Sequence, residues 1–91
     1  MPYKLTRTES YFKKLVKFLK AHPNMRDKYE KMLMLVSINP YHPSLRLHKL
    51  QGNLKEFYSV SLDLQYRIIL DFIITENEII LLDISSHDDV Y

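Results

Sequence analysis

The sequence contains no cysteine and only one glycine among its 91 residues. Without cysteine, the chain has no disulfide framework, no thiolate chemistry and no zinc–cysteine site. A single glycine cannot build a glycine-rich phosphate loop. Long apolar runs are missing too: none approaches the roughly 20 residues of a membrane span, and the opening residues lack the apolar stretch of a signal peptide. These absences predict a soluble, cytoplasmic protein with no membrane partner.

The histidines and serines lack the spacing of two familiar kinds of site. His22, His42, His48 and His87 form no HExxH sequence and no other short metal-ligand spacing. No serine stands in the nucleophile elbow of a serine hydrolase. We therefore expect no metal, no cofactor and no serine-hydrolase chemistry.

Positive charge is concentrated in the first part of the chain. Residues 1–55 hold twelve Lys and Arg against three Asp and Glu, a balance of +9, whereas residues 56–91 hold one against eight, a balance of −7. A basic region of this kind fits a polyanionic partner such as nucleic acid. A solvated, lysine-rich helix face would give the same count.

The beginning of the chain predicts a short strand followed by a helix. Residues 2–5 fit an edge strand, because a leading proline is tolerated there. Thr6 and Glu9 have the spacing of a capping box. The helix should end at His22, because the residue before a proline is pushed out of the α region. Apolar residues at i, i+3, i+4 and i+7 predict its buried face: Phe12, Leu15, Val16 and Leu19.

A second helix and a group of strands follow within one continuous domain, 1–91. The helix is predicted over residues 24–39 with Asn24 as its N-cap. Beyond Ser44 the apolar period changes to two, which predicts strands over 45–50, 57–62, 66–75 and 79–84 and turns at 51–53 and 75–78. The predicted buried stripe of the helix is Tyr29, Met32, Leu33 and Val36. A short strand, a two-helix hairpin and a three- to four-stranded antiparallel meander packed on the helices make an α+β fold.

The two faces of the strand predicted over 66–75 differ in polarity. Arg67 and Asp71 lie on one face, together with Ile69 and Ile73, and this half-polar face presents Arg67 as the place to look for function. The other face is apolar and should pack on the helices; its residues are Tyr66, Ile68, Leu70, Phe72 and Ile74.

Three side chains on predicted strands or at their ends could cleave RNA without a metal: His48, Arg67 and His87. One imidazole can remove the proton of the RNA 2′-hydroxyl while the other protonates the departing 5′-oxygen. A guanidinium can stabilise the charge that develops on the phosphoryl oxygens. Spacing does not show that the three converge. In the structural alternative, His48 faces solvent and Arg67 pairs with Asp71 or Asp83.

Three segments resemble motifs of the RelE/ParE toxin superfamily and appear in the family's order. Residues 47–55, LHKLQGNLK, resemble the H-x-L-x-G-x-(L/W)-K turn of the YafQ branch. Residues 66–70, YRIIL, resemble the (Y/H)-R-(I/L)-(I/V)-(Y/F) strand of RelE and YoeB. Residues 86–91, SHDDVY, resemble the H-x-x-(L/V)-(Y/F) ending of the YafQ branch. The chain length and the predicted order of elements are similar as well.

This resemblance implies a RelE-like fold and a ribosome-dependent mRNA endonuclease, the toxin of a type II toxin–antitoxin system. It implies that His48 is an acid/base residue, Arg67 the phosphate-stabilising arginine and His87 the C-terminal catalytic histidine, with acid and base not distinguished. The implied partners are a cognate antitoxin, mRNA on the ribosome with contacts to 16S ribosomal RNA, and operator DNA reached through the antitoxin. The residues implied to bind the substrate are Arg46, Lys49, Lys55 and Tyr91.

Asp83 departs from the family pattern, because YafQ-like members tend to carry an arginine near the final histidine. Two other functions are compatible with the same fold. A ParE-like inhibitor of DNA gyrase would need no catalytic histidine, so His48 and His87 argue against it. A RelE-fold binding module without activity is the other, and Asp83 is the best argument for it.

Overall fold

The computed structural model describes residues 3–50, 57–73 and 76–86. Two helices and five strands form within these ranges: β1 (Lys4–Arg7), α1 (Glu9–Ala21), α2 (Arg26–Ile38), β2 (His48–Lys49), β3 (Tyr58–Ser61), β4 (Tyr66–Ile73) and β5 (Glu78–Ser86). Two single 3-10 turns, η1 (Pro23–Met25) and η2 (Pro43–Leu45), lie on either side of α2. The strands form one sheet in the order β1-β5-β4-β3-β2. The predicted α+β class and antiparallel meander are confirmed, and β1 adds a parallel pairing with β5.

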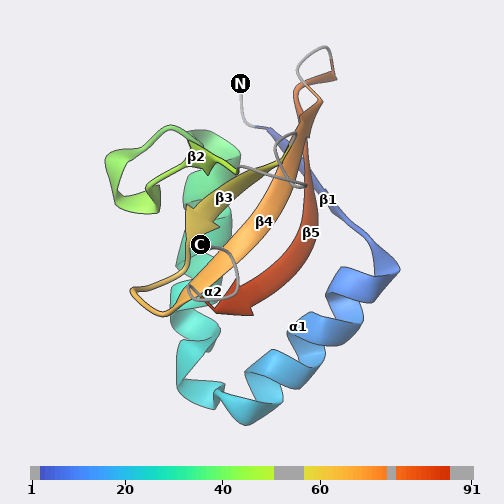
Figure 1. Cartoon of the computed structure of the whole chain (residues 1–91), viewed down its shortest axis with the longest axis vertical. Coiled ribbons are helices and arrows are strands. Elements are labelled where there is room, and N and C mark those ends of the chain that lie inside the picture. The colour runs from blue at the N-terminus through green and yellow to red at the C-terminus, as the bar shows by residue number, and fades with distance from the viewer. Residues whose placement is uncertain (1–2, 51–56, 74–75, 87–91) are drawn as a thin grey trace.

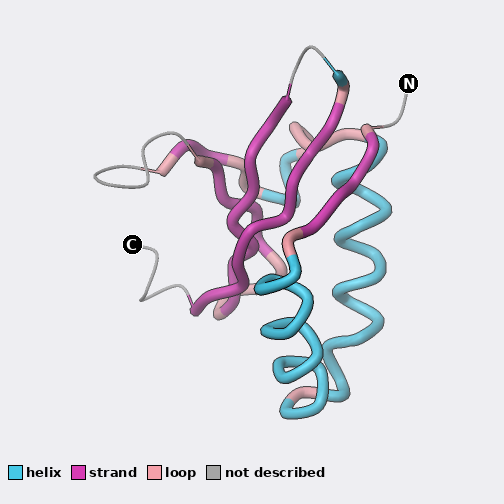
Figure 2. Tube along the Cα trace, turned by 90° about the vertical axis from the view of Figure 1, so that its right-hand side faces the viewer, coloured by secondary structure: helices cyan, strands magenta, loops and turns pink. Residues whose placement is uncertain are grey.

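Both helices pack against the same face of the sheet (Figures 1 and 2). The apolar core lies between the helices and this face. From the helices it includes Tyr11, Leu15, Tyr29, Met32 and Val36, and from the sheet Val60, Leu62, Ile68, Leu70, Ile79, Leu81 and Ile84. Inside this core the hydroxyls of Tyr11 and Tyr29 share a hydrogen bond of 2.7 Å that joins α1 to α2. Neither helix has the length and apolar run that a membrane-spanning helix requires.

The first helix begins two residues later than the capping-box spacing predicted. Thr6 and Arg7 belong to β1, where they pair in register with Ile80 and Leu81 of β5. Thr8 is therefore the N-cap, and its side-chain oxygen accepts a hydrogen bond of 3.1 Å from the backbone N–H of Tyr11. The capping box at Thr6 was wrong because the parallel pairing with a distant strand extends β1. The predicted end at His22 is confirmed.

The buried face of α1 is rotated by one residue from the prediction. Tyr11 and Leu15 are buried, whereas Phe12 is 42% exposed and Val16 is exposed too. Tyr11 can occupy the core because its hydroxyl finds a partner in Tyr29. The Phe12 ring lies on the surface under the guanidinium of Arg7, whose central carbon is 4.4 Å from the ring centroid.

The second helix has the predicted stripe but not the predicted start. Tyr29, Met32 and Val36 are buried, and Leu33 packs partly buried against them. Asn24 is not the N-cap: it lies within η1, and α2 follows Met25, whose side chain makes no capping hydrogen bond. Pro23 explains the difference, because its fixed φ suits the first position of a 3-10 turn.

The strand predicted over 45–50 was wrong for most of its length. Pro43 starts a 3-10 turn, which is capped by a hydrogen bond of 3.1 Å from the backbone N–H of Ser44 to Nδ1 of His42. Leu45 is buried at the end of this turn, and Arg46 adopts a left-handed conformation with φ 50° that redirects the chain. Strand pairing is left to the two residues of β2. The turn predicted at 51–53 lies outside the described residues.

The remaining strands lie close to their predicted positions. The strand predicted over 57–62 is Tyr58–Ser61, and the one predicted over 66–75 is Tyr66–Ile73, with 74–75 outside the described residues. The last strand runs from Glu78 to Ser86, longer than 79–84, because it pairs with β4 on one side and with β1 on the other. Ile69 pairs with Asp83 and Leu70 with Leu81, so Leu82 is the extra residue of a β-bulge.

Candidate functional site

His48 and Arg67 share the face of the sheet that points away from the helices. His48 pairs with Ser59 and Ser59 with Ile69, while Ser61 pairs with Arg67 one step further along. Directly paired residues point to the same face, and this set alternates with the core residues of β3 and β4. Two strands and two residues of displacement separate the Cα atoms of His48 and Arg67 by about 12 Å.

A backbone contact orients the ring of half-buried His48. Its Nδ1 lies 3.0 Å from the carbonyl oxygen of Arg46. A carbonyl oxygen can only accept, so Nδ1 donates this hydrogen bond. In the neutral ring Nε2 then carries the lone pair. This is the tautomer that a general base needs, with its basic nitrogen turned away from the backbone.

Arg67 is recessed into the sheet. Its side chain is 5% exposed, and its Nε and Nη1 atoms are buried from solvent. Arg67 lies on the predicted face of β4, where it pairs with Ser61 on one side and Ser85 on the other, but it is buried there rather than exposed. Burial lowers the pKa of Arg67, the positive charge of Arg46 lowers it further, and the carboxylate of Asp63 raises it. The guanidinium stays charged, so an anion bound beside it would offset its loss of hydration.

Arg46 acts on both candidate catalytic residues, on His48 through its backbone and on Arg67 through the charge of its side chain. Its carbonyl oxygen accepts the hydrogen bond from His48 Nδ1, and its guanidinium is close enough to Arg67 to lower that residue's pKa. The left-handed backbone of Arg46 is part of this arrangement.

Lys49 lies apart from this group. It follows His48 in β2 and pairs with Tyr58, so its side chain belongs to the opposite face of the sheet. It is exposed there. The other predicted site residues, His87, Lys55 and Tyr91, lie outside the described residues.

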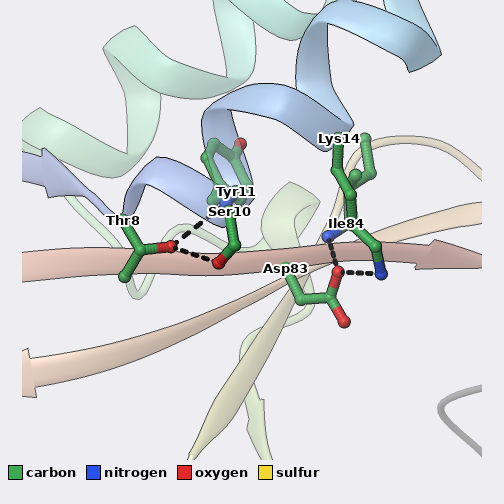
Figure 3. A network of polar contacts seen from close by, with 6 residues as sticks. All are labelled: Thr8, Ser10, Tyr11, Lys14, Asp83 and Ile84. Atoms are coloured by element: carbon green, nitrogen blue, oxygen red, sulfur yellow. Dashed lines mark hydrogen bonds and ion pairs between the residues drawn. The ribbon is translucent and has the colours of Figure 1, made fainter.

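Asp83 is held by α1 rather than by the candidate site. Its Oδ1 atom accepts a hydrogen bond of 2.8 Å from Lys14 Nζ and another of 2.8 Å from the backbone N–H of Ile84 (Figure 3). The carboxylate is thus neutralised by a lysine on the helix beside it.

Asp63 is a residue that the sequence analysis did not single out. Its Oδ1 atom accepts hydrogen bonds of 2.8 Å from the backbone N–H of both Gln65 and Tyr66. These bonds fix the turn that leads directly into Arg67. An aspartate at the start of a short polar stretch between two strands is the signal for such a turn. Within 3–50, 57–73 and 76–86 no group of three His, Cys, Asp or Glu is placed to hold a metal ion.

No protein-family model and no curated protein matches the sequence. Solved structures match it over nearly the whole chain. The conserved hypothetical protein HP0894 of Helicobacter pylori is 25% identical with a TM-score of 0.70, and the match covers 100% of both chains. A chain of the E. coli DinJ–YafQ toxin–antitoxin complex is 16% identical with a TM-score of 0.75, covering 100% of this chain and 99% of that one. A chain of the YoeB–YefM complex of Staphylococcus aureus is 19% identical with a TM-score of 0.73, covering 96% and 99%.

The chain has the RelE/YafQ/YoeB toxin fold. The resemblance seen in three short segments of the sequence is confirmed at the level of the fold. In this toxin fold the strands that carry His48 and Arg67 are β2 and β4 of the sheet, and Arg46 lies just before β2.

Proposed function

We propose that this chain is the toxin of a type II toxin–antitoxin pair, a ribosome-dependent endonuclease that cleaves mRNA in the cytoplasm without a metal. The observation that carries the proposal is the placement of His48 and Arg67 on one face of a RelE-type sheet, with Arg46 contacting one and electrostatically coupled to the other. A base and two guanidinium groups around one span of about 12 Å suit a phosphodiester better than a neutral ligand.

In the proposed reaction the RNA supplies its own nucleophile. Nε2 of His48 takes the proton of the 2′-hydroxyl, and the 2′-oxygen attacks the adjacent phosphorus. The bond from phosphorus to the 5′-oxygen breaks, and His87 gives that oxygen a proton. The products are a 2′,3′-cyclic phosphate and a free 5′-hydroxyl. Arg67 and Arg46 stabilise the negative charge of the phosphoryl oxygens in the transition state.

The burial of Arg67 supports its proposed role. A charge in a low-dielectric site acts more strongly on a nearby anion than an exposed one does. The same burial means that the RNA strand must be delivered in one orientation to reach the guanidinium. The ribosome would hold the mRNA in that orientation, so the ribosome rather than this small chain would position the substrate. We propose ribosomal RNA as the contact of the basic surface and an antitoxin as the partner that neutralises the toxin.

The test is controlled expression of the full chain with separate measurements of translation, mRNA integrity and DNA replication. We expect growth arrest with cut mRNA and continuing replication. His48→Gln, Arg67→Gln and His87→Gln should each lower cleavage by about 10²–10⁴-fold, the usual value of an acid/base group or a transition-state donor. Arg26→Gln is the matched control, because Arg26 is an exposed arginine on α2.

Three results would count against the proposal. Folded variants that arrest growth like the parent would show that the assigned residues are not catalytic. Arrested replication with intact mRNA would favour a gyrase inhibitor. No arrest at all from the folded parent would favour a binding module.

A further inference from the structure

The ring of His42 caps η2, the 3-10 turn that lies between α2 and β2. Pro43, the first residue of the turn, has no N–H, so the N–H of Ser44 is the first in the turn that needs an acceptor. Nδ1 of His42 accepts a hydrogen bond of 3.1 Å from this N–H, and Oγ of Ser44 lies 2.8 Å from the same nitrogen. Histidine thus fills the position that aspartate, asparagine, serine or threonine usually fills at the start of a helix.

The capped turn leads directly to the candidate site along the segment that joins α2 to β2 (green in Figure 1). The N–H of Leu45 donates to the carbonyl oxygen of His42 over 3.0 Å, and the buried side chain of Leu45 anchors the turn in the core. The N–H of Arg46 donates to the carbonyl oxygen of Pro43 over 3.2 Å. The carbonyl oxygen of Arg46 in turn accepts the hydrogen bond from Nδ1 of His48. A series of hydrogen bonds thus connects the ring of His42 to the ring of His48.

The backbone just ahead of β2 is strained and needs this support. Arg46 adopts a left-handed conformation with φ 50° and ψ 46°, which a residue other than glycine keeps only where its surroundings hold it. β2 is two residues long, with His48 paired to Ser59 and Lys49 to Tyr58. So short a strand gives little support to the residues before it, and the hydrogen bonds of the capped turn therefore contribute directly to the placement of Arg46.

The two rings at the ends of this series use the same nitrogen in opposite ways. Nδ1 of His42 accepts from an N–H, so the proton of the neutral ring lies on Nε2. Nδ1 of His48 donates to the carbonyl oxygen of Arg46, so the proton of that neutral ring lies on Nδ1. The position of the proton on His48 therefore reports whether the carbonyl oxygen of Arg46 is in place.

We propose that His42 is a positioning residue of the candidate site: its ring caps η2 and thereby holds the carbonyl oxygen of Arg46 against Nδ1 of His48. The tautomer of His48 that a general base needs is thus set six residues away, by a side chain that does not touch the substrate. The consequence for RNA cleavage rests on the proposed function, whereas the consequence for the ring of His48 does not.

The first measurement is the position of the proton on His48, read from its ring-nitrogen chemical shifts in NMR at about pH 8, where histidine is ordinarily neutral. We expect His42→Ala to shift the equilibrium of His48 from the Nδ1–H to the Nε2–H form about fivefold, the usual effect of losing an N-cap. His42→Asn should stay within about twofold of the parent, because asparagine is a preferred N-cap residue. Its Oδ1 atom is as many bonds from Cα as Nδ1 of histidine, and it also accepts.

Thr8→Ala is the matched control, because it removes the N-cap hydrogen bond of a different helix. Oγ of Thr8 accepts 3.1 Å from the N–H of Tyr11 at the start of α1. This variant should lose stability in urea as His42→Ala does, but the proton of His48 should remain on Nδ1.

The second measurement is cleavage of mRNA on the ribosome by the same variants. His42→Ala should lower kcat about fivefold and leave KM unchanged, because the effect acts on the base and not on the affinity for RNA. His42→Asn should restore kcat to within about twofold of the parent.

Three outcomes would overturn the proposal. An unchanged tautomer of His48 in folded His42→Ala would mean that the cap does not act on the site. A variant His42→Asn that behaves like His42→Ala would mean that the acceptor atom is not what matters. An equal shift of the tautomer in Thr8→Ala would mean that any loss of stability loosens the site.

The two measurements separate this proposal from the proposed function. If the tautomer of His48 responds as expected but the chain cleaves no RNA, the positioning role of His42 stands and the nuclease fails. If the chain cleaves RNA and His42→Ala changes neither the tautomer nor kcat, the nuclease stands and the positioning role is wrong.

Discussion

Replacing one hydroxyl of the buried tyrosine pair should destabilise the protein, and the two single replacements should differ. Tyr11 is 0% exposed and Tyr29 is 5% exposed, and their hydroxyl oxygens are 2.7 Å apart. Tyr29→Phe leaves the hydroxyl of Tyr11 with no access to water, so we expect the full cost of an unsatisfied buried group, about 2–3 kcal/mol. Tyr11→Phe leaves the hydroxyl of Tyr29, which can reach water more easily, at about 1–2 kcal/mol.

The double replacement should cost less than the sum of the single ones. Once both hydroxyls are gone, no buried polar group remains without a partner, and the pair of phenylalanine rings keeps the packing between α1 and α2. We expect the double variant to lose about 1 kcal/mol relative to the parent, which gives a coupling free energy of about 2 kcal/mol or more. Urea unfolding of all four proteins, followed by circular dichroism at matched protein concentration, measures it.

Additive free energies in this cycle would refute the reasoning, because they would mean that the two hydroxyls do not interact in solution. Equal costs for the two single variants would show that their different exposure has no effect. Phe12→Leu, at an exposed position of α1 next to Tyr11, is the control for a change that leaves the pair intact.

Three further predictions follow from the same structure. Burial raises the pKa of Tyr11, so the folded state keeps a proton that the unfolded chain loses above about pH 10. The contribution of Tyr11 to stability should be constant below that pH and fall above it by about 1.4 kcal/mol per pH unit. Burial raises the pKa of Tyr29 as well, so the protein should lose stability more steeply than this, and Tyr11→Phe should make the fall shallower in urea titrations. Arg46→Gly should be more stable than Arg46→Ala by about 1 kcal/mol, because only glycine relieves the strain of the left-handed backbone. Both variants should lose cleavage, and a glycine variant less stable than the alanine variant would contradict this. Ribosome association should weaken as the salt concentration rises. Arg46→Gln should reduce the slope of log K against log salt concentration by about 0.7–0.9, the value of one lost phosphate contact. An unchanged slope would mean that Arg46 does not contact RNA.

The elements of the fold followed from local sequence patterns, and the errors arose where distant contacts act. The stripe of α2 was correct because every third or fourth residue faces one core. The start of α1 was misplaced because β1 is extended by its parallel pairing with β5, which is far away in the sequence. The strand predicted over 45–50 failed because alternation of apolar residues does not reveal a left-handed residue at Arg46. An alternating pattern shows which residues lie on the same face of a strand, but it does not show where the backbone changes direction.

The candidate site was predictable to the extent that strand alternation determines it. Alternation in 66–73 puts Arg67 on the face opposite to the core, and the register of β2 with β3 then brings His48 to that face. The placement of Arg46 beside this face was not predictable from alternation, since it depends on a backbone carbonyl oxygen that contacts His48 and on a positive charge that lowers the pKa of Arg67. Lys49 shows the converse, because a residue adjacent to His48 in the sequence lies on the other face of the sheet.

The structure also divides the positive charge that the composition showed as one excess. Lys14 donates a hydrogen bond to Asp83, the carboxylate that departs from the family pattern, so these two opposite charges pair with each other. One groove is lined by Lys28, Lys31 and Arg46 together with aliphatic side chains. The basic residues of the first part of the chain therefore lie in different surroundings. Arg46 acts on the proposed site in two ways, because its carbonyl oxygen accepts a hydrogen bond from His48 and its positive charge lowers the pKa of Arg67, so a substitution there tests both at once.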